Sequence, residues 1–160
     1  VSIALVVLST LFVLPVRANE PAAPMLVVPV IAILAWLVAV AQIITIFLGI
    51  LTTGSGPHAG DAKAPRNGLS TYLLKHVHSY PAYAAVGLTV VLLVLVILGH
   101  LYAARNAAIT LLVINAAQVA VGIWQSRTGL PPLLVGTHML LACLVAAATT
   151  TVLYRLRKAL

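Results

Sequence analysis

Four of the five histidines fall in or near long apolar stretches of the chain, namely His76, His78, His100 and His138. An ionisable or ligating side chain is costly inside a membrane span, so each is a candidate functional residue. If one helix begins near Thr71 and another near Pro132, His78 lies seven residues into the first and His138 six into the second. At about 1.5 Å per residue, both imidazoles then lie roughly 9–11 Å below the same face of a bundle. We therefore expect the two rings to be level.

Two level imidazoles that face each other across a bundle suit the axial ligation of a haem iron. His78 and His138 are therefore the predicted metal ligands. His76 is less suitable, because residues two apart point to nearly opposite sides of a helix. Zinc is a weaker alternative, since no cysteine or carboxylate joins the pair at ligand spacing. The simpler alternative is that each histidine only forms a hydrogen bond across helices.

Two polar stripes precede these histidines in the chain. The first consists of Gln42, Thr45, Gly49 and Thr52, and the second of Asn115, Gln118, Gly122 and Gln125. Both step by three, four and three residues, which places each stripe on one helical face. Each stripe leads into a Gly/Pro loop and then a helix with a histidine near its start, which indicates two repeated helical hairpins. We expect Gln118 and Gln125 to contact the cofactor, whereas the alternative is that the stripes only allow close helix packing.

The elements that position these residues follow from composition. Of 160 residues, 62% are hydrophobic and only 7% charged, with a mean hydropathy of +1.15. So few charges exclude a water-soluble globule and a disordered chain. The net charge of +7 does not indicate nucleic-acid binding, because the basic residues are scattered among apolar blocks. The uncharged stretches predict an all-α membrane bundle of four transmembrane helices, near 27–52, 72–101, 104–126 and 132–154.

The four helices constitute one predicted domain, residues 18–160. Residues 1–17 are apolar up to Arg17 but short for a span, and we expect them to be the end of a truncated transmembrane helix. A compact basic cluster follows the last helix and consists of Arg155, Arg157 and Lys158. Since basic residues mark the cytoplasmic side, this cluster predicts a cytoplasmic C-terminus.

Two long motifs resemble the C-terminal half of haem A synthase, a membrane enzyme. They are TGSGPHAGD at Thr53–Asp61 and QVAVGIWQSRTGLPPLLVGTHM at Gln118–Met139, together with the position of His78. The resemblance covers essentially the whole chain. It implies eight helices in two homologous halves, of which the C-terminal half carries a bis-histidine haem b. By position, His78 and His138 correspond to the ligands of that haem.

The resemblance also implies a function in haem A biosynthesis, the oxidation of the C8 methyl of haem O to a formyl group. The substrate haem O and the catalytic carboxylate belong to the N-terminal half, which is missing here, so no catalytic residue is assigned. Glu20 and Asp61 are the only acidic residues, and both lie in predicted loops. We therefore expect this chain alone not to complete the reaction.

The expected partners are the missing N-terminal half, a supplier of haem O, an electron donor or acceptor in the membrane, and membrane lipid. The expected location is a bacterial plasma membrane. Basic residues in the loops on the histidine side are candidates to pair with haem propionates, namely Lys63, Arg66, Lys75 and Arg127. Two other functions remain open: a non-enzymatic membrane cytochrome b that transfers electrons, and a haem-free transporter or assembly subunit.

Overall fold

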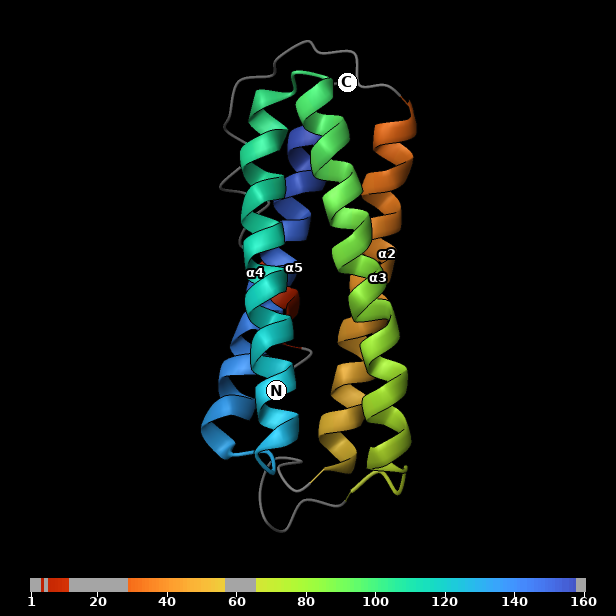
Figure 1. Ribbon diagram of the computed structural model, residues 1–160, viewed down its shortest axis with the longest axis vertical. Coiled ribbons are helices and arrows are strands. Elements are labelled where there is room, and N and C mark those ends of the chain that lie inside the picture. Colours follow the sequence, from red (N-terminus) through yellow and green to blue (C-terminus); the bar gives the residue numbers. More distant parts are fainter. Residues whose placement is uncertain (1–3, 5, 12–28, 57–65, 158–160) are drawn as a thin grey trace.

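The chain folds into a bundle of long antiparallel helices (Figure 1). The computed structural model describes residues 4, 6–11, 29–56 and 66–157. Within these residues there is no strand, and the four long helices are α2 (Pro29–Ser55), α3 (Thr71–Leu98), α4 (Tyr102–Arg127) and α5 (Pro132–Arg157). The predicted all-α bundle is confirmed, with helix ends within a few residues of those expected. Of the predicted truncated helix, only residues 4 and 6–11 are described, and they are helical.

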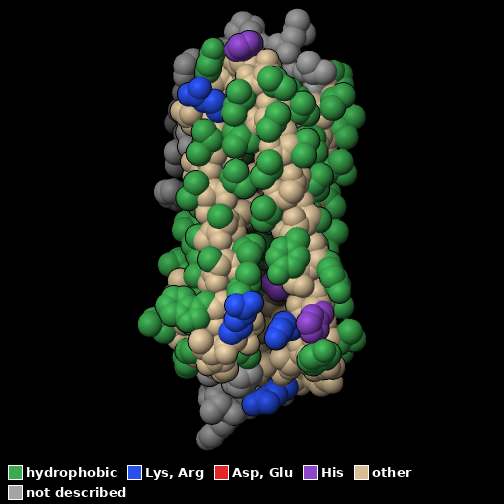
Figure 2. Space-filling model, viewed as in Figure 1, with side chains coloured by type: hydrophobic (Ala, Val, Ile, Leu, Met, Phe, Trp, Pro, Cys, Tyr) green, Lys and Arg blue, Asp and Glu red, His purple; other side chains and the backbone are tan. Residues whose placement is uncertain are grey.

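All four helices are long and apolar enough to cross a membrane, with 25 to 28 residues each. Large apolar side chains lie on the outside along the length of the bundle (Figure 2). Ile43 on α2 and Val113 on α4 are 66% and 62% exposed. In water such a surface would aggregate, whereas in a bilayer it contacts acyl chains. The chain is therefore a multi-pass membrane protein with a lipid-facing apolar exterior.

The interior of the bundle is built mainly from small residues. Ala35, Ala85, Ala104 and Ala108 are all nearly inaccessible. Lipid is as apolar as leucine, so hydrophobic burial does not drive membrane helices together, and close packing of small residues takes its place. The α2–α3 and α4–α5 pairs pack more extensively than the α3–α4 and α2–α5 pairs. The bundle therefore consists of two helical hairpins joined along a looser seam.

The two hairpins share eight buried positions, as expected of the predicted repeat. On α2 and α4 the matching buried pairs are Ile31 with Ala104, Ala35 with Ala108, Val38 with Leu111, and Gln42 with Asn115. On α3 and α5 they are Ala85 with Val145, Thr89 with Thr149, Leu92 with Val152, and Val96 with Leu156. Equivalent faces of the two hairpins therefore meet in the core.

Polar side chains join the hairpins at one point in this core. Gln42 Nε2 donates to Asn115 Oδ1 at 2.9 Å, and these two residues occupy equivalent positions of the repeat. Asn115 Nδ2 in turn donates to Thr89 Oγ1 at 3.4 Å, and Thr89 Oγ1 donates to the carbonyl of Ala85 at 2.7 Å. Because each buried group that takes part has a partner, the chain of hydrogen bonds fixes the register between α2, α3 and α4.

We expect Gln42→Leu to lower the free energy of unfolding by about 1–2 kcal/mol, because it leaves the Asn115 amide oxygen buried without its donor. Equilibrium unfolding in bicelles measures this. The double variant with Asn115→Leu should cost less than the sum of the single changes, with a coupling of about 0.6–1.7 kcal/mol. Ile43→Leu, which faces lipid, is the matched control. Strict additivity of Gln42→Leu and Asn115→Leu would show that the two amides do not interact.

Candidate functional site

The local sequence determines where α3 and α5 begin, and so places His78 and His138 in the second or third turn of their helices. Ser70 caps α3, since its hydroxyl oxygen accepts a hydrogen bond from the Leu73 amide at 3.3 Å. Helix α5 begins at Pro132, whose missing N–H would have no partner in a first turn. These are the two starts that the sequence predicts, so His78 and His138 lie at the expected depths in α3 and α5.

The structure brings His78 and His138 together across the bundle. Their ring centroids are 6.3 Å apart, and the ring planes lie at 79° to each other. His76 is exposed and lies edge-on against Tyr72 on its own helix, with centroids 4.8 Å apart. His100 is at the opposite end of α3, in a turn with a positive φ of 53°. Of the four histidines that the structure describes, only the predicted pair therefore forms a two-imidazole site.

The hydrogen bonds of the two rings indicate where each carries its lone pair. His78 Nδ1 is 2.9 Å from the carbonyl oxygen of Thr45, which can only accept, so Nδ1 carries the proton and Nε2 the lone pair. His138 Nε2 is 3.4 Å from the amide nitrogen of Gln118, which can only donate, so this Nε2 also carries the lone pair. A backbone carbonyl on Nδ1 is a common way to orient a metal-ligating histidine.

Glycines from the two polar stripes make room for the rings. A Cβ added at Gly49 would lie 3.0 Å from His78 Cε1, and one added at Gly122 would lie 3.0 Å from His138 Cε1. Both distances are shorter than ordinary contacts of a side-chain carbon, so any larger residue would displace the ring. The same contact occurs in both hairpins, which accounts for the glycine at the same step of each stripe.

Of the two glutamines predicted to contact the cofactor, one lies beside the histidines and the other further along α4. Gln118 lines the cavity beside the histidines, whereas Gln125 lies two helical turns further along α4. Among the described residues, the amide oxygens of both glutamines and His138 Nδ1 are buried without a hydrogen-bond partner. Buried polar atoms rarely lack partners in folded proteins. These unpaired atoms are consistent with a ligand or water in this region.

The cavity between the histidines is small, about 60 Å³. Besides the expected residues it is lined by Val6 near the N-terminus, by Ile46 and Ile50 of α2, and by Met139, Ala142 and Cys143 of α5. Sequence reasoning did not select these six residues. The α5 residues follow His138 at one, four and five positions, so helical spacing from the histidine was the available signal. Among the described residues, no three histidine, cysteine or acidic side chains cluster as a metal site.

Basic side chains lie at the same end of the bundle as the two histidines. Arg66, Lys75 and Arg127 are all exposed there, and Lys63 lies outside the described residues. Figure 2 shows blue basic side chains around a hollow at its lower end, with histidine beside it. The end that carries the imidazole pair therefore has a positive rim.

Comparison with known proteins identifies no relative: no family model, curated protein or solved structure matches the chain.

Proposed function

We propose that the chain holds a b-type haem whose iron is ligated by His78 and His138. The observation that carries this proposal is the spacing of the two rings. A metal–imidazole bond is about 2.0 Å and the bonded nitrogen lies roughly 1.1 Å from its ring centre, so two imidazoles that held one metal from opposite sides would have centres roughly 6.2 Å apart. The separation in this protein is 6.3 Å. The donors also suit the group, because a haem iron needs only two ligands from the protein.

The surrounding residues would prepare the pair for that metal. The Thr45 carbonyl holds the proton of His78 on Nδ1, which leaves Nε2 free to ligate. The Gln118 amide lies against the corresponding Nε2 of His138, so it must turn away before this nitrogen can ligate. A bound haem would supply reversible one-electron transfer. Its propionates would suit the positive rim of Arg66, Lys75 and Arg127.

The volume of the site implies movement on binding. A porphyrin is several times larger than the cavity of about 60 Å³. The helices within each hairpin pack closely, whereas the seams between hairpins are less extensive. Because His78 and His138 are already spaced for one metal, we expect the room to come from side chains that turn away along these seams, Gln118 among them, and not from a wider separation of the two rings.

The test is the reduced-minus-oxidised absorption spectrum of the chain. The protein is expressed with haem supplied and is then purified in detergent. We expect sharp low-spin b-type bands. If His78 and His138 kept the 79° angle between their ring planes while they held a haem, the two imidazoles would be nearly perpendicular. The ferric protein should then give a strongly anisotropic low-spin EPR signal. A protein that folds but stays colourless, or whose haem is high-spin, would contradict bis-histidine ligation and favour the haem-free alternatives.

For the biological role, we propose the haem-b-binding half of a haem A synthase in a bacterial plasma membrane, with the C-terminus in the cytoplasm. The two long motifs around Gly54 and Gly129 support this assignment, because they resemble haem A synthase and occur together with the histidine pair. The activity would be the oxidation of haem O to haem A, in partnership with an N-terminal half that supplies the catalytic carboxylate.

One observation favours the alternative of an electron-transferring membrane cytochrome b. Helices α2 to α5 contain no aspartate or glutamate, so the bundle has no carboxylate for acid–base chemistry. The coding sequence upstream of Val1 distinguishes the two roles. A second four-helix segment with its own histidines and an intramembrane glutamate supports the synthase, and a gene without one supports the cytochrome.

A further inference from the structure

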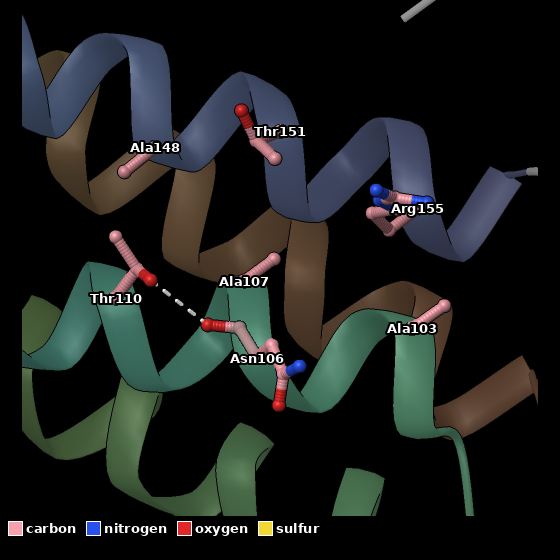
Figure 3. A pocket seen from close by; sticks show the side chains of 7 residues that line it. All are labelled: Ala103, Asn106, Ala107, Thr110, Ala148, Thr151 and Arg155. Carbon is pink, nitrogen blue, oxygen red and sulfur yellow. Dashed lines mark hydrogen bonds between the residues drawn. The ribbon is translucent and has the colours of Figure 1, made fainter. Parts of the chain in front are cut away.

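A polar groove lies between α4 and α5 at the end of the bundle opposite the histidine pair (Figure 3). It encloses about 290 Å³, and small alanine side chains form its floor. Its polar lining consists of Asn106, Thr110, Thr151 and Arg155. We propose that this groove binds the headgroup of an anionic phospholipid, with the phosphate on Arg155 and Asn106. This site is separate from the histidine pair and does not depend on haem.

The donors of the groove suit a phosphate ester. The guanidinium of Arg155 carries five N–H donors in a planar fork that matches the oxygens of a phosphate. The Asn106 amide oxygen accepts from Arg105 Nε at 3.4 Å, so its NH₂ group is the part that remains to donate. One positive charge and one amide donor on facing helices therefore define an anion site.

The acceptors of the groove suit the rest of such a headgroup. Thr110 donates its hydroxyl proton to the Asn106 carbonyl at 3.0 Å, and Thr151 donates to the Ala147 carbonyl at 2.8 Å. The lone pairs of each hydroxyl oxygen would therefore offer a ligand an acceptor. Figure 3 shows Asn106 and Thr110 on α4 across the groove from Thr151 and Arg155 on α5. A glycerol headgroup, which carries hydroxyl donors next to its phosphate, complements this arrangement.

The depth of the groove in the membrane also fits a lipid. Asn106 lies in the second turn of α4 and Arg155 in the last turn of α5, which is where headgroups lie. Toward the middle of the bundle, Val113 follows Thr110 by three residues on α4 and Leu144 precedes Ala148 by four on α5, and these two side chains are 62% and 44% exposed. A polar groove with exposed apolar side chains nearer the middle of the bundle suits a single lipid. Its headgroup would lie in the groove and its acyl chains along the helices.

Native mass spectrometry of the full 160-residue chain tests the proposal with phosphatidylglycerol, phosphatidylcholine and inorganic phosphate as separate probes. We expect the parent protein to retain phosphatidylglycerol tightly. In Arg155→Gln the Kd for this lipid should rise about tenfold, because one charge-assisted contact is lost. Arg127→Gln, which removes an exposed arginine at the other end of α4, is the matched control and should leave the Kd unchanged. Asn106→Leu provides a second variant, and circular dichroism verifies that each protein is helical.

Three outcomes would overturn the proposal. The first is an equal Kd for phosphatidylglycerol in the Arg155→Gln, Asn106→Leu and Arg127→Gln proteins. The second is retention of phosphatidylcholine as tight as that of phosphatidylglycerol, which would show that the groove does not recognise an anionic headgroup. The third is displacement of the lipid by inorganic phosphate at similar concentration, which would assign the groove to free phosphate.

Discussion

Replacement of His78 or His138 by alanine is expected to abolish the low-spin haem spectrum. Loss of a residue that only orients a metal ligand commonly lowers metal affinity 10–100-fold, so loss of a ligand itself should lower haem affinity by at least about 100-fold. The two variants should be equivalent, because each would remove one of the two proposed iron ligands. The measurement is the haem-to-protein ratio of the purified proteins, together with the reduced-minus-oxidised spectrum.

His76→Ala is the matched control for this prediction. His76 lies on the same helix, two residues before His78, but it is exposed and contacts Tyr72. Its removal should leave the haem content and spectrum unchanged. A low-spin spectrum that survives in His78→Ala, or disappears in His76→Ala, would show that the ligand has been assigned to the wrong histidine.

The second large effect is expected at the glycines beside the rings. A Cβ at Gly49 or Gly122 would lie 3.0 Å from the Cε1 atom of the nearest imidazole. Gly49→Ala and Gly122→Ala should therefore rotate the ring, lower the haem content and destabilise the protein by about 1–3 kcal/mol through overpacking. Gly49→Leu and Gly122→Leu should prevent haem binding altogether. Haem-to-protein ratio and thermal unfolding measure both effects.

Gly87 and Gly136 provide controls on the helices that carry the two histidines. A Cβ at either position would meet no atom within 4 Å. Alanine in a helix interior is favoured over glycine by up to about 1 kcal/mol. Gly87→Ala and Gly136→Ala should therefore retain haem and be slightly more stable than the parent protein. Equal haem loss at all four glycines would show that Gly49 and Gly122 have no special relation to the rings.

Much of the architecture could be predicted from the order of residues. Charges are too costly to leave in a bilayer core, so uncharged stretches predict the four helices. Ser70 and Pro132 mark where α3 and α5 begin, and a constant rise per residue then makes His78 and His138 level. The distinction between His78 and His76 also follows from helical geometry, because the two side chains point to nearly opposite sides of α3.

The polar stripes show where such reasoning ends. Their spacing is equally suitable for helix packing and for a binding site, and the structure divides them between both. Gln42 and Asn115 join the two hairpins in the core, whereas Gly49 and Gly122 lie against the imidazoles. Thr52 donates to the Leu48 carbonyl of its own helix. Each polar stripe therefore contributes to helix packing at one end and to the histidine site at the other.

The sequence by itself determined the membrane spans, the repeat and the depth of the two histidines, because these depend on composition and on the fixed geometry of a single helix. Only the tertiary structure decided that the rings lie 6.3 Å apart, that Gln118 rests on His138, and that a polar groove forms between α4 and α5. These features depend on how far apart two helices pack and how each is rotated about its axis. Those quantities are the outcome of all the side chains that meet in the core, and no local pattern specifies them.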